Sequence, residues 1–164
     1  MQQRFAPFLL DRLMDHSSGA GPADASRLTR SLEQLKDSVA RDVEALLNSR
    51  SAMSEAELSD YKEAKRSLLR FGLDDFSSRT LASVDDRAHI CQSIQRAIAD
   101  HETRLRNTVV EIEVDNTRGG GAVRFLIRGL LVLHPTAEPV SFDAVMRTGS
   151  KHYEVQKSPL RRSA

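Results

Sequence analysis

Apolar residues recur every three or four positions between residues 28 and 47, a spacing that places them on one side of a helix. The stripe consists of Leu28, Leu32, Leu35, Val39, Val43, Leu46 and Leu47. Ser31 followed by Gln34 has the form of a capping box, so the helix is expected to start there and to leave Leu28 just outside. Asn48 suits the left-handed position that ends many helices. The pattern therefore predicts a core helix that ends near residue 48.

Two further helices are predicted before the pattern changes. The segment DYKEAKRSLLRFGL, residues 60–73, has the composition of a shorter helix that Gly72 closes. Ser83 followed by Asp86 is a second capping pattern and opens a longer helix. The expected inner face of this helix comprises Ala88, Cys91, Ile94, Ile98, His101 and Leu105.

After Asn107 the period of the apolar residues changes from about 3.6 to about 2, which predicts half-buried strands. The first strand has Val110, Ile112 and Val114 inward. After the hairpin loop NTRGGG, the second has Val123, Phe125, Ile127, Leu131 and Leu133 inward and Arg124 and Arg128 outward. The two glutamates between the first strand's apolar residues, Glu111 and Glu113, are therefore expected to face those arginines. VSFDAVM and KHYEV predict two more strands.

Helices followed by hairpin-linked strands predict an α+β fold, with N-terminal helices packed on one face of a small antiparallel β-sheet. The linker composition of DHSSGAGPADAS separates an N-terminal arm and flexible linker, residues 1–27, from a domain over residues 28–157 and a basic C-terminal tail, residues 158–164. The segment before Ser26 is expected to stay outside the core. VSFDAVM, or the KHYEV strand beside it, is expected to form an open edge of the sheet.

The composition limits the function classes. A chain of 164 residues is about one domain, and its 24 Lys and Arg nearly cancel its 23 Asp and Glu, which argues against nucleic acid as a partner. The apolar run FAPFLL is too short for a signal peptide or a membrane span. A single cysteine, Cys91, excludes an internal disulfide and agrees with a reducing compartment. We therefore expect a cytoplasmic protein that does not insert into membrane.

The sequence contains no convincing catalytic constellation. Glu111 and Glu113 have a spacing that a glycosidase pair can use, but an open, arginine-lined face would not raise the pKa of either. The five histidines are scattered over unlike elements, and Cys91 lies on an apolar helix face where its pKa rises. Gly119 to Gly121 lead into a strand, so they build no phosphate cradle. We expect no catalytic residue, metal, cofactor or small-molecule substrate.

The junction ADHETRLRNTVVEIEVD passes from the helix pattern to the strand pattern almost without a loop. Glu102, Thr103 and Arg104 occupy it. The helical phase places Glu102 beside the buried face and Arg104 further round, near the solvated edge. Two interpretations stay open on the residues alone: a solvated helix end, in which exposed charges contribute little, and a docking point for another protein.

Several ordered segments resemble the TssE family of type VI secretion baseplates, which is similar to the wedge protein of contractile phage tails sometimes labelled lysozyme-like. The segments are FLLDRL, SLEQLKDSVARDVEALLNSR, KRSLLRFGLDDF, AIADHETRLRNTVVEIEV and FLIRGLLVLHPTAEPVSFDAVM, and they cover most of residues 8 to 148. In this family the junction usually reads Glu-Pro-Arg, and here Thr103 stands in place of the proline.

The resemblance implies a structural baseplate protein without catalysis, which binds other wedge subunits and offers its sheet to the first ring of the contractile sheath. It implies that Glu102, Thr103 and Arg104 bind baseplate partners. The implied sheath-contact edge strand carries Val140, Phe142 and Val145, and the implied contact in the N-terminal arm carries Leu9, Leu10 and Leu13. Two alternatives from other classes are a peptidoglycan hydrolase, as the inherited label suggests, and a regulatory anti-adaptor on the same fold.

Overall fold

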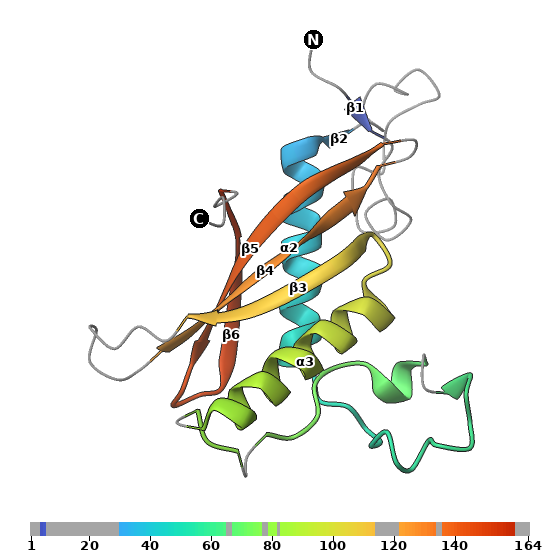
Figure 1. The fold of residues 1–164 in the computed structure, drawn as a ribbon. Helices are drawn as coiled ribbons and strands as arrows, with labels where there is room; N and C mark the ends of the chain where they lie inside the picture. Colours follow the sequence, from blue (N-terminus) through green and yellow to red (C-terminus); the bar gives the residue numbers. More distant parts are fainter. Residues whose placement is uncertain are drawn as a thin grey trace, which may run out of the picture.

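The computed structural model describes residues 4–5, 30–64, 67–76, 79–81, 83–113, 122–133 and 136–159. Two α-helices pack on a four-stranded antiparallel sheet, which confirms the predicted α+β class (Figure 1). The elements are β1 (Arg4–Phe5), β2 (Arg30–Ser31), α2 (Leu32–Asn48), the 3-10 helix η3 (Leu68–Arg70), α3 (Val84–His101), β3 (Leu105–Glu113), β4 (Ala122–Val132), β5 (Ala137–Arg147) and β6 (His152–Ser158).

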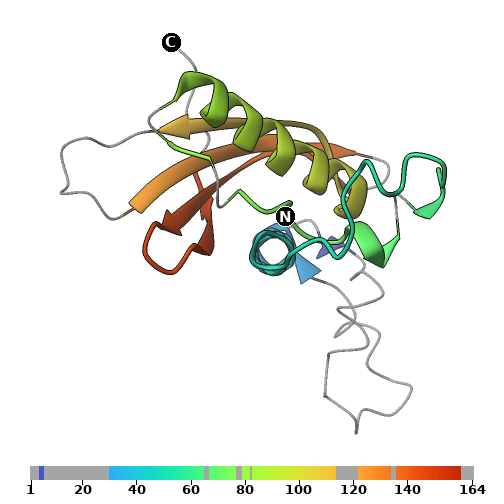
Figure 2. The same cartoon turned by 90° about the horizontal axis from the view of Figure 1, so that it is seen from below.

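Helix α2 begins and ends close to where its sequence predicts. The Ser31 side chain accepts a hydrogen bond from the Gln34 amide, and the Gln34 side chain accepts one from the Ser31 amide, so the capping box is confirmed. The apolar stripe from Leu35 to Leu47 is buried, and the helix packs against β6 and β5 (Figure 2). Asn48 does not take a left-handed conformation, because it is the last helical residue and its side chain is held by β6.

The predicted helix over residues 60–73 is wrong. The described part of this segment consists of turns and the short η3, and Leu68 and Leu69 are exposed, so the segment lacks a buried face that would stabilise a helix. Instead Leu73 pairs with Arg50 in an isolated parallel bridge. Gly72 has a φ of 111°, and a Cβ there would lie 2.6 Å from the Ser49 carbonyl group.

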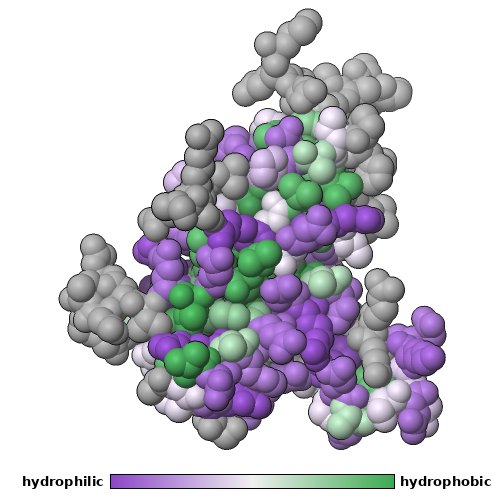
Figure 3. Space-filling view, viewed as in Figure 1, coloured by the Kyte–Doolittle hydropathy of each residue, from purple (hydrophilic) through white to green (hydrophobic). Residues whose placement is uncertain are grey.

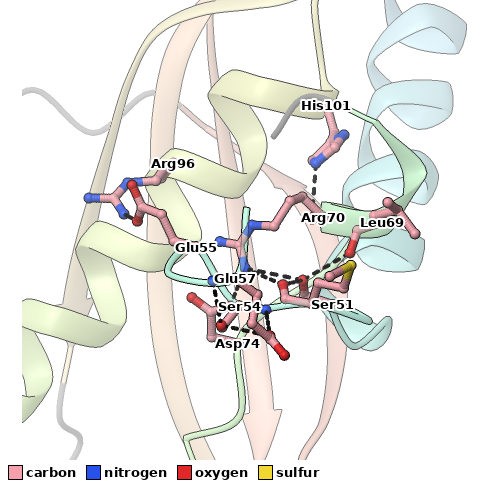
Figure 4. A network of polar contacts seen from close by, with 10 residues as sticks. Ser51, Ser54, Glu55, Glu57, Leu69, Arg70, Asp74, Arg96 and His101 are labelled. Carbon is pink, nitrogen blue, oxygen red and sulfur yellow. Dashed lines mark hydrogen bonds and ion pairs between the residues drawn. The ribbon is translucent and has the colours of Figure 1, made fainter. Parts of the chain in front are cut away.

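Side-chain contacts hold this irregular segment against the end of α3 (Figure 4). The Arg70 guanidinium donates to the Met53 carbonyl at 2.8 Å and to the Ser51 hydroxyl at 3.1 Å, and it forms an ion pair with Asp74 at 2.6 Å. The His101 ring lies within hydrogen-bond distance of the Arg70 carbonyl, at 3.0 Å. Side-chain hydrogen bonds and an ion pair therefore hold this segment, in place of the helical backbone hydrogen bonds that its composition predicts.

Helix α3 starts as predicted, because the Ser83 hydroxyl accepts a hydrogen bond from the Asp86 amide. Its buried residues are Ile90, Ile94, Ala97 and Ile98. Of the predicted inner face, Ile94 and Ile98 are correct, Cys91 and His101 are half-buried, and Ala88 is exposed. The real face is therefore rotated toward Ile90 and Ala97.

The sheet has the strand order β3-β4-β5-β6, and every neighbouring pair is antiparallel. The inward residues predicted for β4 are all buried, and they form one cluster with the buried faces of both helices. On the other face Glu113 pairs with Arg124 at 3.9 Å, and Glu111 forms an ion pair with Arg128, as predicted. Figure 3 shows hydrophilic and hydrophobic residues interspersed over the surface seen from the direction of Figure 1.

The N-terminal segment contributes more to the fold than its composition predicts. Arg4–Phe5 pairs with Arg30–Ser31, and Phe5 packs against the core. The expectation that the segment before Ser26 stays outside the core is therefore wrong at Phe5. Leu9, Leu10 and Leu13 lie outside the described residues, so their partner contact stays a prediction.

Candidate functional site

The junction between α3 and β3 is a tight turn. Glu102 caps the helix, with its amide donating to the Ile98 carbonyl at 2.8 Å. The Leu105 amide donates to the Glu102 carbonyl at 3.1 Å, which closes the turn, and β3 begins at Leu105. Within this turn Thr103 is exposed, whereas Glu102 is buried and Arg104 is half-buried. The chain therefore reverses over three residues and brings the side chains of Glu102 and Arg104 together.

Arg104 and Glu102 form a two-pronged ion pair. The Arg104 Nε donates to the Glu102 Oε1 at 2.6 Å, and Nη2 donates to Oε2 of the same carboxylate. The Arg104 backbone amide also donates to Oε1, at 3.1 Å. The side chains are only 12% and 7% exposed, respectively. This planar geometry is specific to arginine, because a lysine ammonium cannot match both carboxylate oxygens.

Arg104 also joins the junction to α2. Its Nη2 forms a second ion pair with Asp42, and its Nη1 donates to the hydroxyl of fully buried Ser38 at 3.4 Å. We call the set Ser38, Asp42, Glu102 and Arg104 the junction cluster. The sequence-based position of Arg104 near a solvated edge is wrong, because these three partners make it favourable to bury the guanidinium. In the sequence, Ser38 and Asp42 directly precede Val39 and Val43 of the apolar stripe of α2. This position beside the buried face was the signal that could have identified them as partners.

Electrostatic interactions within the junction cluster keep the Arg104 guanidinium charged. Burial acts to lower the pKa of Arg104, but the hydrogen bond and charge of Glu102, and then those of Asp42, raise it above its ordinary value. The guanidinium therefore stays protonated at neutral pH. A permanently charged, fully engaged side chain suits a structural clamp, whereas a proton-transfer group needs a pKa near the working pH.

The predicted edge strand lies inside the sheet. Phe142 and Val145 are on β5, which pairs with β4 on one side and with β6 on the other. Val140, just before the stretch that β6 covers, is 2% exposed. Placing Phe142 and Val145 at an edge is therefore wrong, because β6 pairs outside them, and Val140 is buried although β6 does not reach it. The alternative prediction, with KHYEV at the edge, is confirmed for β6.

Side chains of α2 cover part of the outer edge of β6. The Asn48 amide accepts from the Tyr153 backbone amide and donates to the Tyr153 carbonyl, both at 2.9 Å, as a neighbouring strand would. Glu44 accepts from the Val155 amide at 2.8 Å. Because these groups occupy the outward positions, a new strand cannot add to β6 there without displacing α2.

The other edge of the sheet is β3, and no described strand pairs with its outer side. The Val132 amide donates to the Arg104 carbonyl, and hydrogen-bonding direction alternates along antiparallel strands. With the register shift between Arg106 and Val109, this alternation turns the backbone groups of Val110 and Ile112 outward. Helix α3 runs alongside β3 in Figures 1 and 2, yet no described side chain hydrogen-bonds to these two residues.

The other candidate groups carry little chemistry. Burial raises the pKa of the Cys91 thiol, as predicted, and the nearby charge of Glu111 acts in the same direction. Among the described residues, no three His, Cys, Asp or Glu side chains lie close enough to hold a metal ion. In the same part of the chain, no helix is long and apolar enough to cross a membrane. Glu111 and Glu113 are engaged by arginines on the open face of the sheet.

These features define a small α+β structural module with a clamped helix–strand junction and an edge strand, β3, whose outer side pairs with no described strand. The family model described as baseplate wedge protein gp25 matches residues 33–136, which is more than half of the chain. The chain therefore belongs to the gp25 family of baseplate wedge proteins. A search of curated proteins and a search of solved structures each found no match. The family supports a structural role in the baseplate of a contractile, phage tail-like machine.

Proposed function

We propose that this chain is the TssE-type subunit of a type VI secretion baseplate and joins the other wedge subunits to the first ring of the contractile sheath. It acts in the cytoplasm, at the inner membrane once the baseplate is assembled, and it catalyses no reaction. The observation that carries the proposal is the family match over residues 33–136. The ordered segments that resemble TssE favour type VI secretion over a phage tail.

Strand addition at β3 is the proposed mode of sheath attachment. The outward backbone groups of Val110 and Ile112 offer a hydrogen-bonding edge. The corresponding groups of Tyr153 and Val155 on β6 are occupied by α2 side chains. β3 is therefore the better acceptor for an extended segment of a sheath subunit, and it replaces the edge that the sequence indicated.

The junction cluster serves partner binding indirectly. Glu102 and Arg104 are buried in the monomer, so they hold the turn while exposed Thr103 and the partly exposed carboxylate of Asp42 face the wedge subunits. A partner that contacts the turn recognises the shape of its backbone and the exposed edge of the junction cluster. We propose the same class of partner for Leu9, Leu10 and Leu13.

The decisive experiment is complementation of cells that lack this subunit, with a fluorescent sheath protein as the readout. Ile112→Pro removes one outward amide, which an edge strand tolerates better than an inner strand does. It is expected to abolish sheath assembly while the purified variant still unfolds cooperatively. Ile112→Ala is the matched control, because it loses more side chain but keeps the amide, and sheaths should still form.

Normal sheath assembly with a folded Ile112→Pro variant would show that β3 is not the acceptor edge. Release of peptidoglycan fragments by the purified chain would instead favour the hydrolase alternative. Co-purification with a proteolytic adaptor, and with no baseplate subunit, would favour the anti-adaptor. No contact among the described residues favours either alternative over the baseplate role.

A further inference from the structure

A cavity of about 280 Å³ opens where the β5–β6 turn approaches the segment before α3. Its apolar lining includes Leu81, Ile90, Met146 and Tyr153. Ile90 and Tyr153 are buried, and Leu81 and Met146 are partly exposed, so the lining continues the core outward to the surface. The volume lies near the lower limit of ligand pockets, about 300 Å³, which suits one or two side chains better than a cofactor.

Two exposed cations line the same cavity. Arg50 follows α2, and Lys151 ends the β5–β6 turn. Among the described residues no carboxylate forms an ion pair with either of them. The third cation of the lining, Arg79, is already paired with Asp86 at 3.0 Å, and Asp75 is the acidic residue of the lining. The cavity therefore has a net positive rim around an apolar interior.

The hairpin fixes the position of the Lys151 side of the rim. Lys151 has a φ of 54°, and its amide donates to the Arg147 carbonyl at 2.7 Å, which closes the turn. On the opposite wall, Phe76 lies edge-on to His89 with ring centroids 6.5 Å apart. These contacts hold both walls before any ligand arrives, and a preformed site loses less conformational entropy on binding.

We propose that this cavity binds an acidic segment of a partner protein that inserts one large apolar side chain between Arg50 and Lys151. An apolar anchor in a pocket with charges at its rim is a common arrangement of protein interfaces. Because the family works inside a protein assembly, a protein segment fits better than a fatty acid, which has related chemistry. The cavity is separate from the outer edge of β3, so the inference goes beyond sheath attachment.

The test uses the purified chain and the peptide acetyl-Gly-Asp-Glu-Phe-Asp-Glu-Gly-amide, followed by the amide NMR shifts of the protein. Saturable shifts are expected at Ile90, Met146 and Lys151. The double variant Arg50→Glu/Lys151→Glu should weaken binding at least about tenfold, since it replaces two attractions with repulsions. Lys62→Glu, at an exposed loop residue outside the cavity, is the control for a change of charge and should bind normally.

A second peptide, with Ala in place of Phe, should lose most of the affinity because the anchor is missing. The proposal is overturned if about 1 mM peptide produces no saturable shift, or if the double variant binds as the wild type does. It is also overturned if octanoate saturates the same amides and the peptide does not. All these readouts use the isolated chain, so they do not depend on sheath assembly.

Discussion

Replacing Arg104 with alanine is the sharpest test of the junction cluster. The substitution removes the two-pronged partner of Glu102, whose carboxylate is 7% exposed, together with the contacts to Asp42 and Ser38. Water cannot reach most of the carboxylate that remains. An exposed pair would leave a solvated charge behind, whereas this one leaves a charge in the protein interior.

Removing one partner of a buried ion pair costs about 3–5 kcal/mol in the free energy of unfolding. The side chain of Asp42 is 38% exposed and stays hydrated after the change, so Glu102 carries most of this cost. For a chain of this length, 1 kcal/mol lowers the melting temperature by about 2–4 °C. The expected decrease is therefore about 6–20 °C.

Urea unfolding at neutral pH, followed by circular dichroism, measures the loss directly. Arg106→Ala is the matched control, because Arg106 is exposed two residues further along, and its loss should change stability by less than about 0.5 kcal/mol. Arg104→Lys should recover little, because the ammonium cannot bind both oxygens of Glu102. Glu102→Leu/Arg104→Met should recover most of the stability, because it leaves no unpaired charge in the interior.

A loss below about 1 kcal/mol for Arg104→Ala would show that the pair behaves as a solvated helix end and would refute the clamp. An Arg104→Ala/Glu102→Leu chain that is no more stable than Arg104→Ala alone would refute the reason given for the loss. In that case the packing of the arginine side chain, rather than the uncompensated carboxylate, would account for it.

Three further substitutions test other contacts. Gly72→Ala should cost at least about 3 kcal/mol, since its φ of 111° and the nearby Ser49 backbone both oppose a Cβ; Gly149→Ala, which meets nothing within 4 Å, should be close to neutral. Asn48→Ala should cost about 1–3 kcal/mol in urea unfolding, because it leaves two backbone groups of Tyr153 without partners. Burial raises the pKa of Tyr153 to about 12, so the unfolded chain loses this proton first. The free energy of unfolding should keep the full contribution of Tyr153 below about pH 10 and fall by roughly 3 kcal/mol as the pH rises through about 12, and Tyr153→Phe should lack this loss.

The sequence predicts those elements whose apolar pattern is regular and whose ends carry local signals. Ser31 with Gln34 and Ser83 with Asp86 place two helix starts correctly, because each capping contact spans only three residues. The alternation of apolar and polar residues in β3 and β4 predicts which side chains face the core, because this pattern too is local in the sequence. The helix expected over residues 60–73 is wrong because its composition favours a helix while contacts from Arg70 to distant residues decide its backbone.

The site was harder to predict because it depends on contacts across the fold. The segment after α3 indicates a charged turn, but the burial of Arg104 follows from Ser38 and Asp42, more than sixty residues away. Strand order has the same limitation, since KHYEV pairs outside β5 and turns an expected edge into an inner strand. The choice of β3 over β6 as the open edge likewise depends on distant contacts, those of Asn48 and Glu44 with β6.

The baseplate role is tested most directly by affinity purification of the tagged chain from cells that carry the complete secretion cluster, with mass spectrometry of the bound proteins. The proposal predicts that wild type retains both wedge and sheath subunits, and that Ile112→Pro retains the wedge subunits but loses the sheath. Recovery of neither wedge nor sheath subunits with the folded wild-type chain would contradict the assignment to a type VI baseplate.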